Sequence, residues 1–163
     1  MKFKYTKEFN HKNDWYYEGN VSKKLVEYLK NENYLILKDN SENIKARGID
    51  IIAVRNKITE LIEVKGFPSE YYVNGKQKGK RKKTKPKQQA KHWFSEALLS
   101  CIYNYGKNKL KYENIQLAIA LPENKRYFEL INEISDFFRD YDINIKIYFV
   151  DNKGKVKIVK LNN

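Results

Sequence analysis

The sequence predicts a single α/β domain in which helices cover the faces of a mixed β-sheet. Three segments carry apolar residues at helical spacing, and six short runs have the apolar and β-branched character of strands. In the second half of the chain helices alternate with strands, which favours helices packed on a sheet. The 163 residues contain no repeat or linker that would divide them, so we expect one domain over 1–163.

The elements are predicted in chain order from these periods and from the turn residues between them. The tight Asn56-Lys57 connection between two β-rich runs is a hairpin signal. We expect irregular structure over 1–15, a helix from Glu18, strands over 34–38, 49–55 and 58–65, a helix over 88–105, a strand over 114–122, a helix over 126–141, and strands over 143–151 and 155–161.

Each helix is justified by an apolar face, and the strand over 114–122 by its nearly continuous apolar run, which is typical of a central strand. The first helix carries Val21, Leu25, Tyr28 and Leu29; the second carries Ala90, Phe94, Ala97, Leu98, Cys101 and Ile102; the third carries Phe128, Ile131, Ile134, Phe138 and Tyr141.

The composition indicates a polyanionic partner and excludes several classes of site. The net charge is +13, from 33 basic and 20 acidic residues, which favours nucleic acid, although a generally lysine-rich composition would also produce it. A single cysteine, Cys101, excludes an internal disulfide, and with only two histidines a structural zinc site is excluded too. No apolar run is long enough to cross a bilayer, so we expect a cytoplasmic protein with no membrane partner.

Three charged residues fall inside the predicted hairpin, where isolated charges are costly. Strand alternation places Glu63 and Lys65 on one face, and antiparallel pairing around Asn56-Lys57 brings Asp50 beside them. One interpretation is a surface ion pair on an exposed hairpin face. The other is a site for Mg²⁺ or Mn²⁺, because carboxylates suit hard cations and a neighbouring lysine can orient water and stabilise charge on phosphorus.

The motif Gly48-Ile49-Asp50, followed after 12 residues by Glu63-Val64-Lys65, resembles that of the PD-(D/E)XK nuclease superfamily. This family includes Holliday-junction resolvases and modification-dependent restriction endonucleases. The resemblance implies a restriction-endonuclease-like αβββαβ core, which the predicted order from Glu18 to Leu121 reproduces, extended by a C-terminal helix and two strands. Ile49 stands where the name of the family has proline.

The resemblance also implies roles for individual residues. Asp50 and Glu63 would bind Mg²⁺ (or Mn²⁺), and Lys65 would serve the attacking water. Val64, between Glu63 and Lys65, is counted among the metal-binding positions. Many members carry a further glutamate on the first helix. Glu18 shares the inward stripe with Leu25, whereas Glu27 is rotated from Leu25 by about 200°, so Glu18 is the better candidate. A favourable interaction with the helix N-terminus would equally explain an acid at position 18.

Gln89 stands four residues before Trp93 in the second helix. This resembles the Q-xxx-Y signature of RecB-type branches of the superfamily, with tryptophan in place of tyrosine, and implies that Gln89 supports the catalytic site. Gln88 is the alternative.

A basic segment, residues 69–87, follows the predicted catalytic strand. It carries eight Lys or Arg and no acid between residues 76 and 87, and we expect a flexible loop that holds the phosphate backbone of DNA. A solvated loop without a ligand is the alternative. The predicted nucleic-acid-binding residues are Lys76, Lys78, Lys80, Arg81, Lys82, Lys83, Lys85, Lys87 and Lys91.

Together these features predict a metal-dependent DNA endonuclease of restriction, defence or repair, with structure-dependent or weakly sequence-specific cutting. The alternative is a catalytically silent nucleic-acid-binding protein on the same fold. Because duplex cleavage needs two sites, a homodimer, or a helicase or specificity subunit as partner, is compatible with this prediction.

Overall fold

A computed structural model describes residues 14–43, 47–73 and 75–162 of the chain. Most of the segment predicted to be irregular, residues 1–13, lies outside these ranges. The described elements occur in the predicted order. They are α1 (Glu18–Asn31), β1 (Leu35–Asp39), β2 (Ile51–Arg55), β3 (Ile58–Val64), α2 (Pro86–Asn108), β4 (Ile115–Pro122), α3 (Lys125–Asp140), β5 (Ile145–Val150) and β6 (Val156–Lys160).

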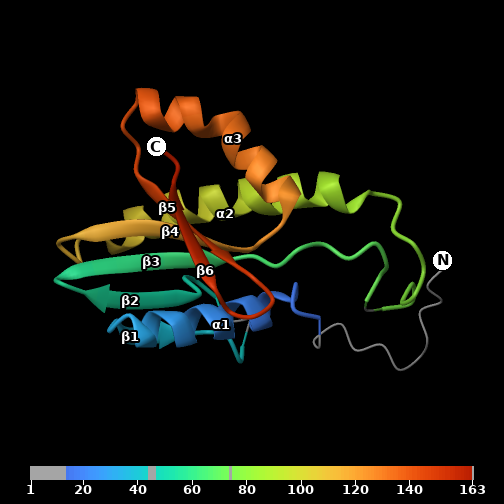
Figure 1. Ribbon diagram of the computed structural model, residues 1–163, viewed down its shortest axis with the longest axis horizontal. Coiled ribbons are helices and arrows are strands. Elements are labelled where there is room, and N and C mark those ends of the chain that lie inside the picture. Colours follow the sequence, from blue (N-terminus) through green and yellow to red (C-terminus); the bar gives the residue numbers. More distant parts are fainter. Residues whose placement is uncertain (1–13, 44–46, 74, 163) are drawn as a thin grey trace.

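The strands form one six-stranded mixed sheet in the order β1-β2-β3-β4-β5-β6 (Figure 1). The first three strands are antiparallel neighbours, β3, β4 and β5 run parallel, and β6 returns antiparallel to β5. Each parallel connection contains a helix, as such crossovers require. The prediction of an α/β protein with helices on a mixed sheet is therefore confirmed.

The hairpin of β2 and β3 turns at Asn56 and Lys57, whose φ angles of 51° and 64° lie in the left-handed region. Two such residues in a two-residue loop match the twist of the flanking strands. The pairing runs from Arg55 opposite Ile58 to Ile51 opposite Ile62. Continued by one residue, this register places Asp50 opposite Glu63, as the sequence predicts.

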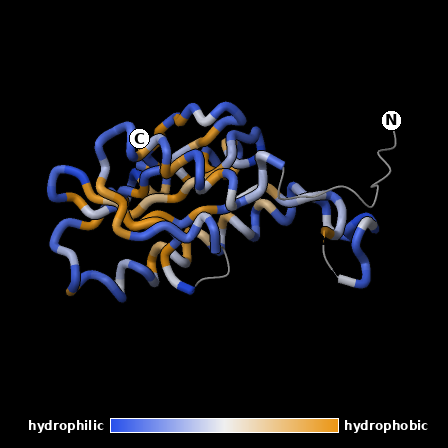
Figure 2. Tube along the Cα trace, turned by 90° about the horizontal axis from the view of Figure 1, so that it is seen from below, coloured by the Kyte–Doolittle hydropathy of each residue, from blue (hydrophilic) through white to orange (hydrophobic). Residues whose placement is uncertain are grey.

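Helix α1 covers one face of the sheet, and α2 and α3 cover the other (Figure 1). Because side chains alternate along a strand, each face has its own core. On the first face Leu25 packs with Ile62, and on the second Phe94 packs with Ile119. In the tube of Figure 2 the apolar stretches accordingly gather along the strands.

Two residues of the predicted apolar helix faces lie outside the core. Tyr141 is 70% exposed because α3 ends at Asp140, before it. Ile102 of α2 is 63% exposed, because the helix packs through the narrow stripe of Ala90, Phe94, Ala97 and Cys101. These buried positions recur every three or four residues, and Ile102 is rotated by about 100° from Cys101, away from the sheet.

The basic segment is more ordered than predicted. It extends beyond the end of the sheet and then returns into α2 (Figures 1 and 2). Its two arms pair through Tyr72 and Lys80, whose backbone N–H and C=O groups lie 2.9 Å apart, and Lys82 N–H donates to Glu70 C=O over 2.8 Å. Its last residues, Pro86 and Lys87, already belong to α2. Within the described ranges, no helix has the length and apolarity that a membrane span requires.

Candidate functional site

Asp50 lies immediately before β2, and its carboxylate is held by the neighbouring strand. Its Oδ2 atom accepts a hydrogen bond of 2.8 Å from the backbone N–H of Val64, at the end of β3. A backbone donor fixes the carboxylate against the strand that carries Glu63, so the relative positions of these two acids depend on the main chain.

Glu63 and Lys65 project from the same face of the chain at the end of β3. Lys65 Nζ and Glu63 Oε1 are 3.4 Å apart, and the two side chains are only 14% and 10% exposed. This excludes the first interpretation of the sequence, an ion pair on an exposed hairpin face. The pair is largely buried, where electrostatic interactions are strong and desolvation is costly.

Glu18 reaches the same cluster from the first turn of α1. The chain before α1 passes directly over the residue after Lys65: Phe67 N–H donates to Tyr16 C=O over 3.0 Å. A Cβ atom on Gly66 would lie 2.4 Å from Tyr16 O and 2.9 Å from Glu18 N, so only glycine allows this approach. The electrostatic neighbours of Glu18 are Lys65 and Asp50.

Burial raises the pKa of all three acids, and the charge of Asp50 adds to the shift of the other two. Desolvation, and then the charge of Asp50, raise the pKa of Glu63 to about 7. The same causes raise the pKa of Glu18 to about 7, although Lys65 and a hydrogen bond with the Gly66 backbone oppose the shift. Desolvation also raises the pKa of Asp50. One buried and two half-buried carboxyls with raised pKa values form a site that a cation would stabilise.

Lys65 is the counter-charge at the centre of this cluster. Burial alone would lower its pKa, but the carboxylates of Glu18, Glu63, Glu96 and Asp50 together raise it. Sequence reasoning missed Glu96, which α2 contributes to the surroundings of Lys65. The sequence feature that could have indicated Glu96 is its position seven residues after Gln89, on the same side of the helix.

Glu63 also lines a hollow of about 370 Å³ that lies between the hairpin and α2. The sequence prediction missed the residues that α2 contributes to it. The lining consists of Gly48, Glu63, Ser100, Tyr103, Asn104 and Lys107. Among the three acids, Glu63 is therefore open to a ligand from this side. Cys101, buried between the helix and the sheet, has its pKa raised to about 12 by desolvation.

Two carboxylates on the hairpin, those of Asp50 and Glu63, are candidate metal ligands. Across the described residues, no group of three or more His, Cys, Asp or Glu side chains is arranged to hold a metal ion. Mg²⁺ is commonly held by one or two carboxylates, with water and substrate oxygens completing its shell. The hairpin pair meets that smaller requirement, with Val64 next to Glu63 in the motif.

The side chain of Gln89 is hydrogen-bonded to the basic segment. Its Oε1 accepts a hydrogen bond of 3.2 Å from Lys82 Nζ, and its Nε2 donates to Thr84 C=O over 2.7 Å. That Gln89 supports the catalytic site stays a prediction. The other predicted nucleic-acid-binding residues are exposed or half-buried along the basic segment and the start of α2: Lys76, Lys78, Lys80, Arg81, Lys83, Lys85, Lys87 and Lys91.

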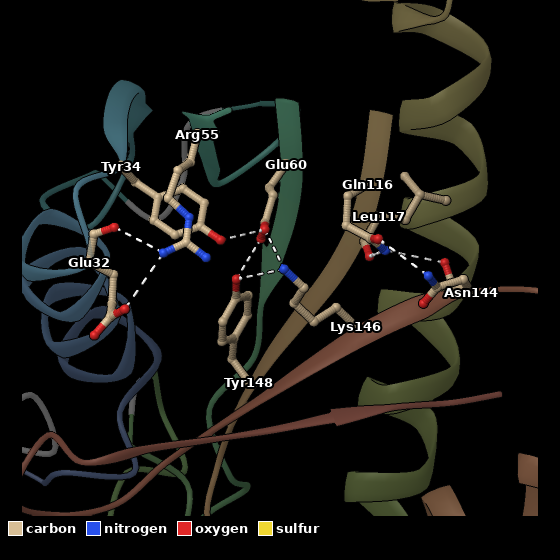
Figure 3. Close-up of polar contacts among 9 residues, drawn as sticks. All are labelled: Glu32, Tyr34, Arg55, Glu60, Gln116, Leu117, Asn144, Lys146 and Tyr148. Carbon is tan, nitrogen blue, oxygen red and sulfur yellow. Dashed lines mark hydrogen bonds and ion pairs between the residues drawn. The ribbon is translucent and has the colours of Figure 1, made fainter. Parts of the chain in front are cut away.

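A second buried polar cluster lies on the opposite face of β3 (Figure 3). Glu60 is 2% exposed and accepts hydrogen bonds from Tyr34 Oη at 2.8 Å and Tyr148 Oη at 2.6 Å. Lys146 of β5 reaches across β4 to the same carboxylate. These partners join the end of α1, β3 and β5, and both carboxylate oxygens of Glu60 are satisfied. We interpret this cluster as structural.

Comparison of the chain with protein-family models, with curated proteins and with solved structures finds no match. Interpretation of the site therefore depends on its own geometry and on the motif.

Proposed function

We propose that the chain is a metal-dependent DNA endonuclease of the PD-(D/E)XK superfamily. One observation carries the proposal: three carboxyls, those of buried Glu63 and of half-buried Asp50 and Glu18, act electrostatically on Lys65 at the end of β3. Clusters of titratable groups with perturbed pKa values beside a hollow are typical of catalytic sites.

The topology supports the assignment to a restriction-endonuclease-like fold. The antiparallel order β1-β2-β3 is continued by β4 parallel to β3, with α1 before β1 and α2 between β3 and β4. This is the αβββαβ order that the motif implies, and the motif residues lie at the end of its central hairpin. Helix α3 with β5 and β6 forms the C-terminal extension.

Asp50, Glu63 and the backbone at Val64 would hold Mg²⁺ or Mn²⁺, and Glu18 would complete the acidic side of the site. The fit is chemical: all ligands are oxygens, and burial, followed by the charge of Asp50, raises the pKa of Glu18 and Glu63. A bound cation would supply counter-charge to these acids. When bound, such an ion polarises the phosphate and lowers the pKa of a bound water.

Lys65 acts as a cation and a hydrogen-bond donor. Its neighbours raise its pKa, so it is protonated at neutral pH and cannot remove a proton from water. An ammonium group at this position attracts the DNA phosphate, orients the attacking water through a donated hydrogen bond, and stabilises the negative charge that grows on the phosphoryl oxygens.

A silent DNA-binding protein on the same fold is the second candidate. It is favoured by the small number of carboxylates on the hairpin, since no group of three potential metal-ligating side chains is found in the described part of the chain. In that case the basic segment would bind DNA, and the acidic cluster would be a remnant without chemistry.

Cleavage of supercoiled plasmid and of branched DNA in Mg²⁺ or Mn²⁺ separates the two candidates. We expect the wild type to cut, and Asp50→Ala and Lys65→Ala to bind DNA without cutting. Binding by all three proteins with no metal-dependent cutting by any would support the silent binder. Cutting that persists in both variants would show that the site lies elsewhere.

A further inference from the structure

A large hollow of about 650 Å³ lies between the basic segment and the beginning of α3. The segment from Arg81 to Lys87 forms one wall, and the first residues of α3 form the other. Lys125 and Arg126 lie on this second wall, and sequence reasoning assigned no role to either. The full lining is Phe67, Glu70, Arg81, Lys82, Lys83, Thr84, Lys85, Pro86, Lys87, Asn124, Lys125, Arg126 and Glu129.

The charge of this hollow is not compensated. Seven of its lining side chains are basic and two are acidic, a surplus of five positive charges. Both acids are already paired, Glu70 with Arg81 at 3.5 Å and Glu129 with Arg126 at 3.2 Å. Arg126 also pairs at 3.1 Å with Glu133, which does not line the hollow. Among the residues described, Lys83, Lys85, Lys87 and Lys125 form no ion pair, so their positive charge is available to a ligand in the hollow.

Two independent features add to this field. Helices α2 and α3 both begin at the hollow, and neither has an acidic residue in its first turn, where acids usually balance the helix dipole. In addition, the Nε atom of Arg126 is buried without a hydrogen-bond partner among the described residues. A buried donor without a partner is costly, and an anion in the hollow would relieve that cost.

The hollow adjoins the carboxylate site. Phe67 lines it and lies two residues after Lys65, and Tyr127 of α3 donates a hydrogen bond of 2.6 Å to the Gly66 carbonyl. The same short strand end therefore carries the acidic cluster on one side and a wall of the basic hollow on the other. An elongated polyanion could occupy both, whereas a small free anion would use only one.

We propose that this hollow holds backbone phosphates of the DNA strand whose scissile phosphate lies at the carboxylates, with Lys125 and Arg126 of α3 as phosphate-binding residues. The inference rests on the proposed function and extends its binding surface from the basic segment to a second element. Contacts of this kind give affinity and position the strand without reading sequence.

The test compares Lys125→Gln with Lys109→Gln. Both remove one exposed lysine charge, but Lys109 follows the C-terminal end of α2, far along the helix from the hollow. Binding of a labelled DNA duplex is measured by fluorescence anisotropy across a salt series in EDTA, which prevents metal-dependent cutting. We plot the logarithm of the DNA association constant against the logarithm of the salt concentration. We expect the slope to become shallower by about 1 for Lys125→Gln, and by about 2 for the double variant Lys83→Gln/Lys125→Gln.

An unchanged slope for Lys109→Gln supports the inference, and equal changes in both single variants would overturn it, because DNA would then sense only total charge. Competition by poly-glutamate that is as strong as competition by DNA and depends on Lys125 would overturn it in favour of a protein partner. The cutting assay tests the proposed function independently. DNA binding that depends on Lys125, without cutting, would support phosphate binding at the hollow and contradict the nuclease. Cutting together with DNA binding that does not depend on Lys125 would support the nuclease and contradict phosphate binding at the hollow.

Discussion

Four ionisable side chains share one small space at the end of β3, and their titration follows from that arrangement. Glu18, Asp50 and Glu63 are largely buried beside one another, and Lys65 alone cannot neutralise three acids. The protein without metal therefore keeps protons on these carboxyls at pH values where exposed acids have lost them. A divalent cation would replace those protons.

This predicts a pH dependence of stability that metal abolishes. Folding raises the pKa of Glu63 and of Glu18 from an ordinary value near 4.5 to about 7. Between these values the folded state binds more protons than the unfolded state, so the free energy of unfolding should fall as pH rises from about 4.5 to 7. Urea unfolding in EDTA should show this fall, and Mg²⁺ should reduce it.

Glu63→Gln provides the control, because it removes one titrating group at nearly constant shape. Its unfolding free energy should depend less on pH than that of the wild type over the same interval, and should no longer respond to Mg²⁺. Equal pH dependence of the two proteins would contradict a shared, metal-binding acidic cluster.

The choice between the two acids of α1 can also be tested at single residues. Glu18→Gln should weaken Mn²⁺ binding and DNA cutting by about tenfold or more, because it removes one oxygen ligand and one charge from the site. Glu27→Gln, on the exposed face of the same helix, should leave both unchanged. Calorimetric titration with Mn²⁺ measures the first effect, and equal losses in both variants would assign the effect to helix stability instead.

The Glu60 cluster predicts a change in stability without a change in metal binding. Lys146→Ala would leave the buried Glu60 carboxylate without its cation, which should cost about 3 kcal/mol or more. Lys153→Ala, at an exposed turn position, should cost almost nothing. Chemical denaturation gives both values, and similar stabilities would show that the two tyrosines alone satisfy Glu60.

At the scale of elements, the contact between α1 and the end of β3 is what assembles the site. Gly66 permits it, because Tyr16 and Glu18 pass where a side chain would stand. Gly66→Ala should destabilise the fold by about 1–3 kcal/mol and weaken metal binding by displacing Glu18. Gly106→Ala is the matched control: no heavy atom lies within 4 Å of the place its new Cβ would take, and in a helix the change should stabilise by about 0.5–1 kcal/mol.

The elements themselves could be predicted because their patterns are local. Apolar spacing and the Asn56-Lys57 turn are properties of short segments, and the hairpin register follows from the turn. The position of Ile102 could not be predicted, because α2 packs through small residues whose stripe is narrower than its apolar face. The paired arms of the basic segment depend on backbone hydrogen bonds, which leave no apolar pattern.

The candidate site was predictable in part for the same reason. Asp50, Glu63 and Lys65 are linked by strand alternation and by the hairpin, both of which are readable from spacing. Glu96 and the walls of the two hollows come from helices that the fold brings together over long sequence separations. The Glu60 cluster was also missed, because it joins β3 to β5 across the small residues of β4.

At the scale of the whole molecule, positive charge surrounds an acidic centre. Most of the net charge of +13 is carried by the basic segment, which returns to the body of the protein beside the carboxylate site. A cationic rim attracts a polyanion that the acidic centre alone would repel. In the function we propose, this rim would bind the DNA strand and the acidic centre would hold the metal.

Lys65→Met tests the central claim most directly, because it removes the ammonium group and leaves all three carboxyls in place. The measurement is the rate constant of DNA cleavage under single-turnover conditions in Mn²⁺, with Lys109→Met as control. We expect Lys65→Met to bind DNA and Mn²⁺ but to cleave about 100-fold or more slowly, and Lys109→Met to cleave like the wild type. Cleavage by Lys65→Met at the wild-type rate would contradict the account.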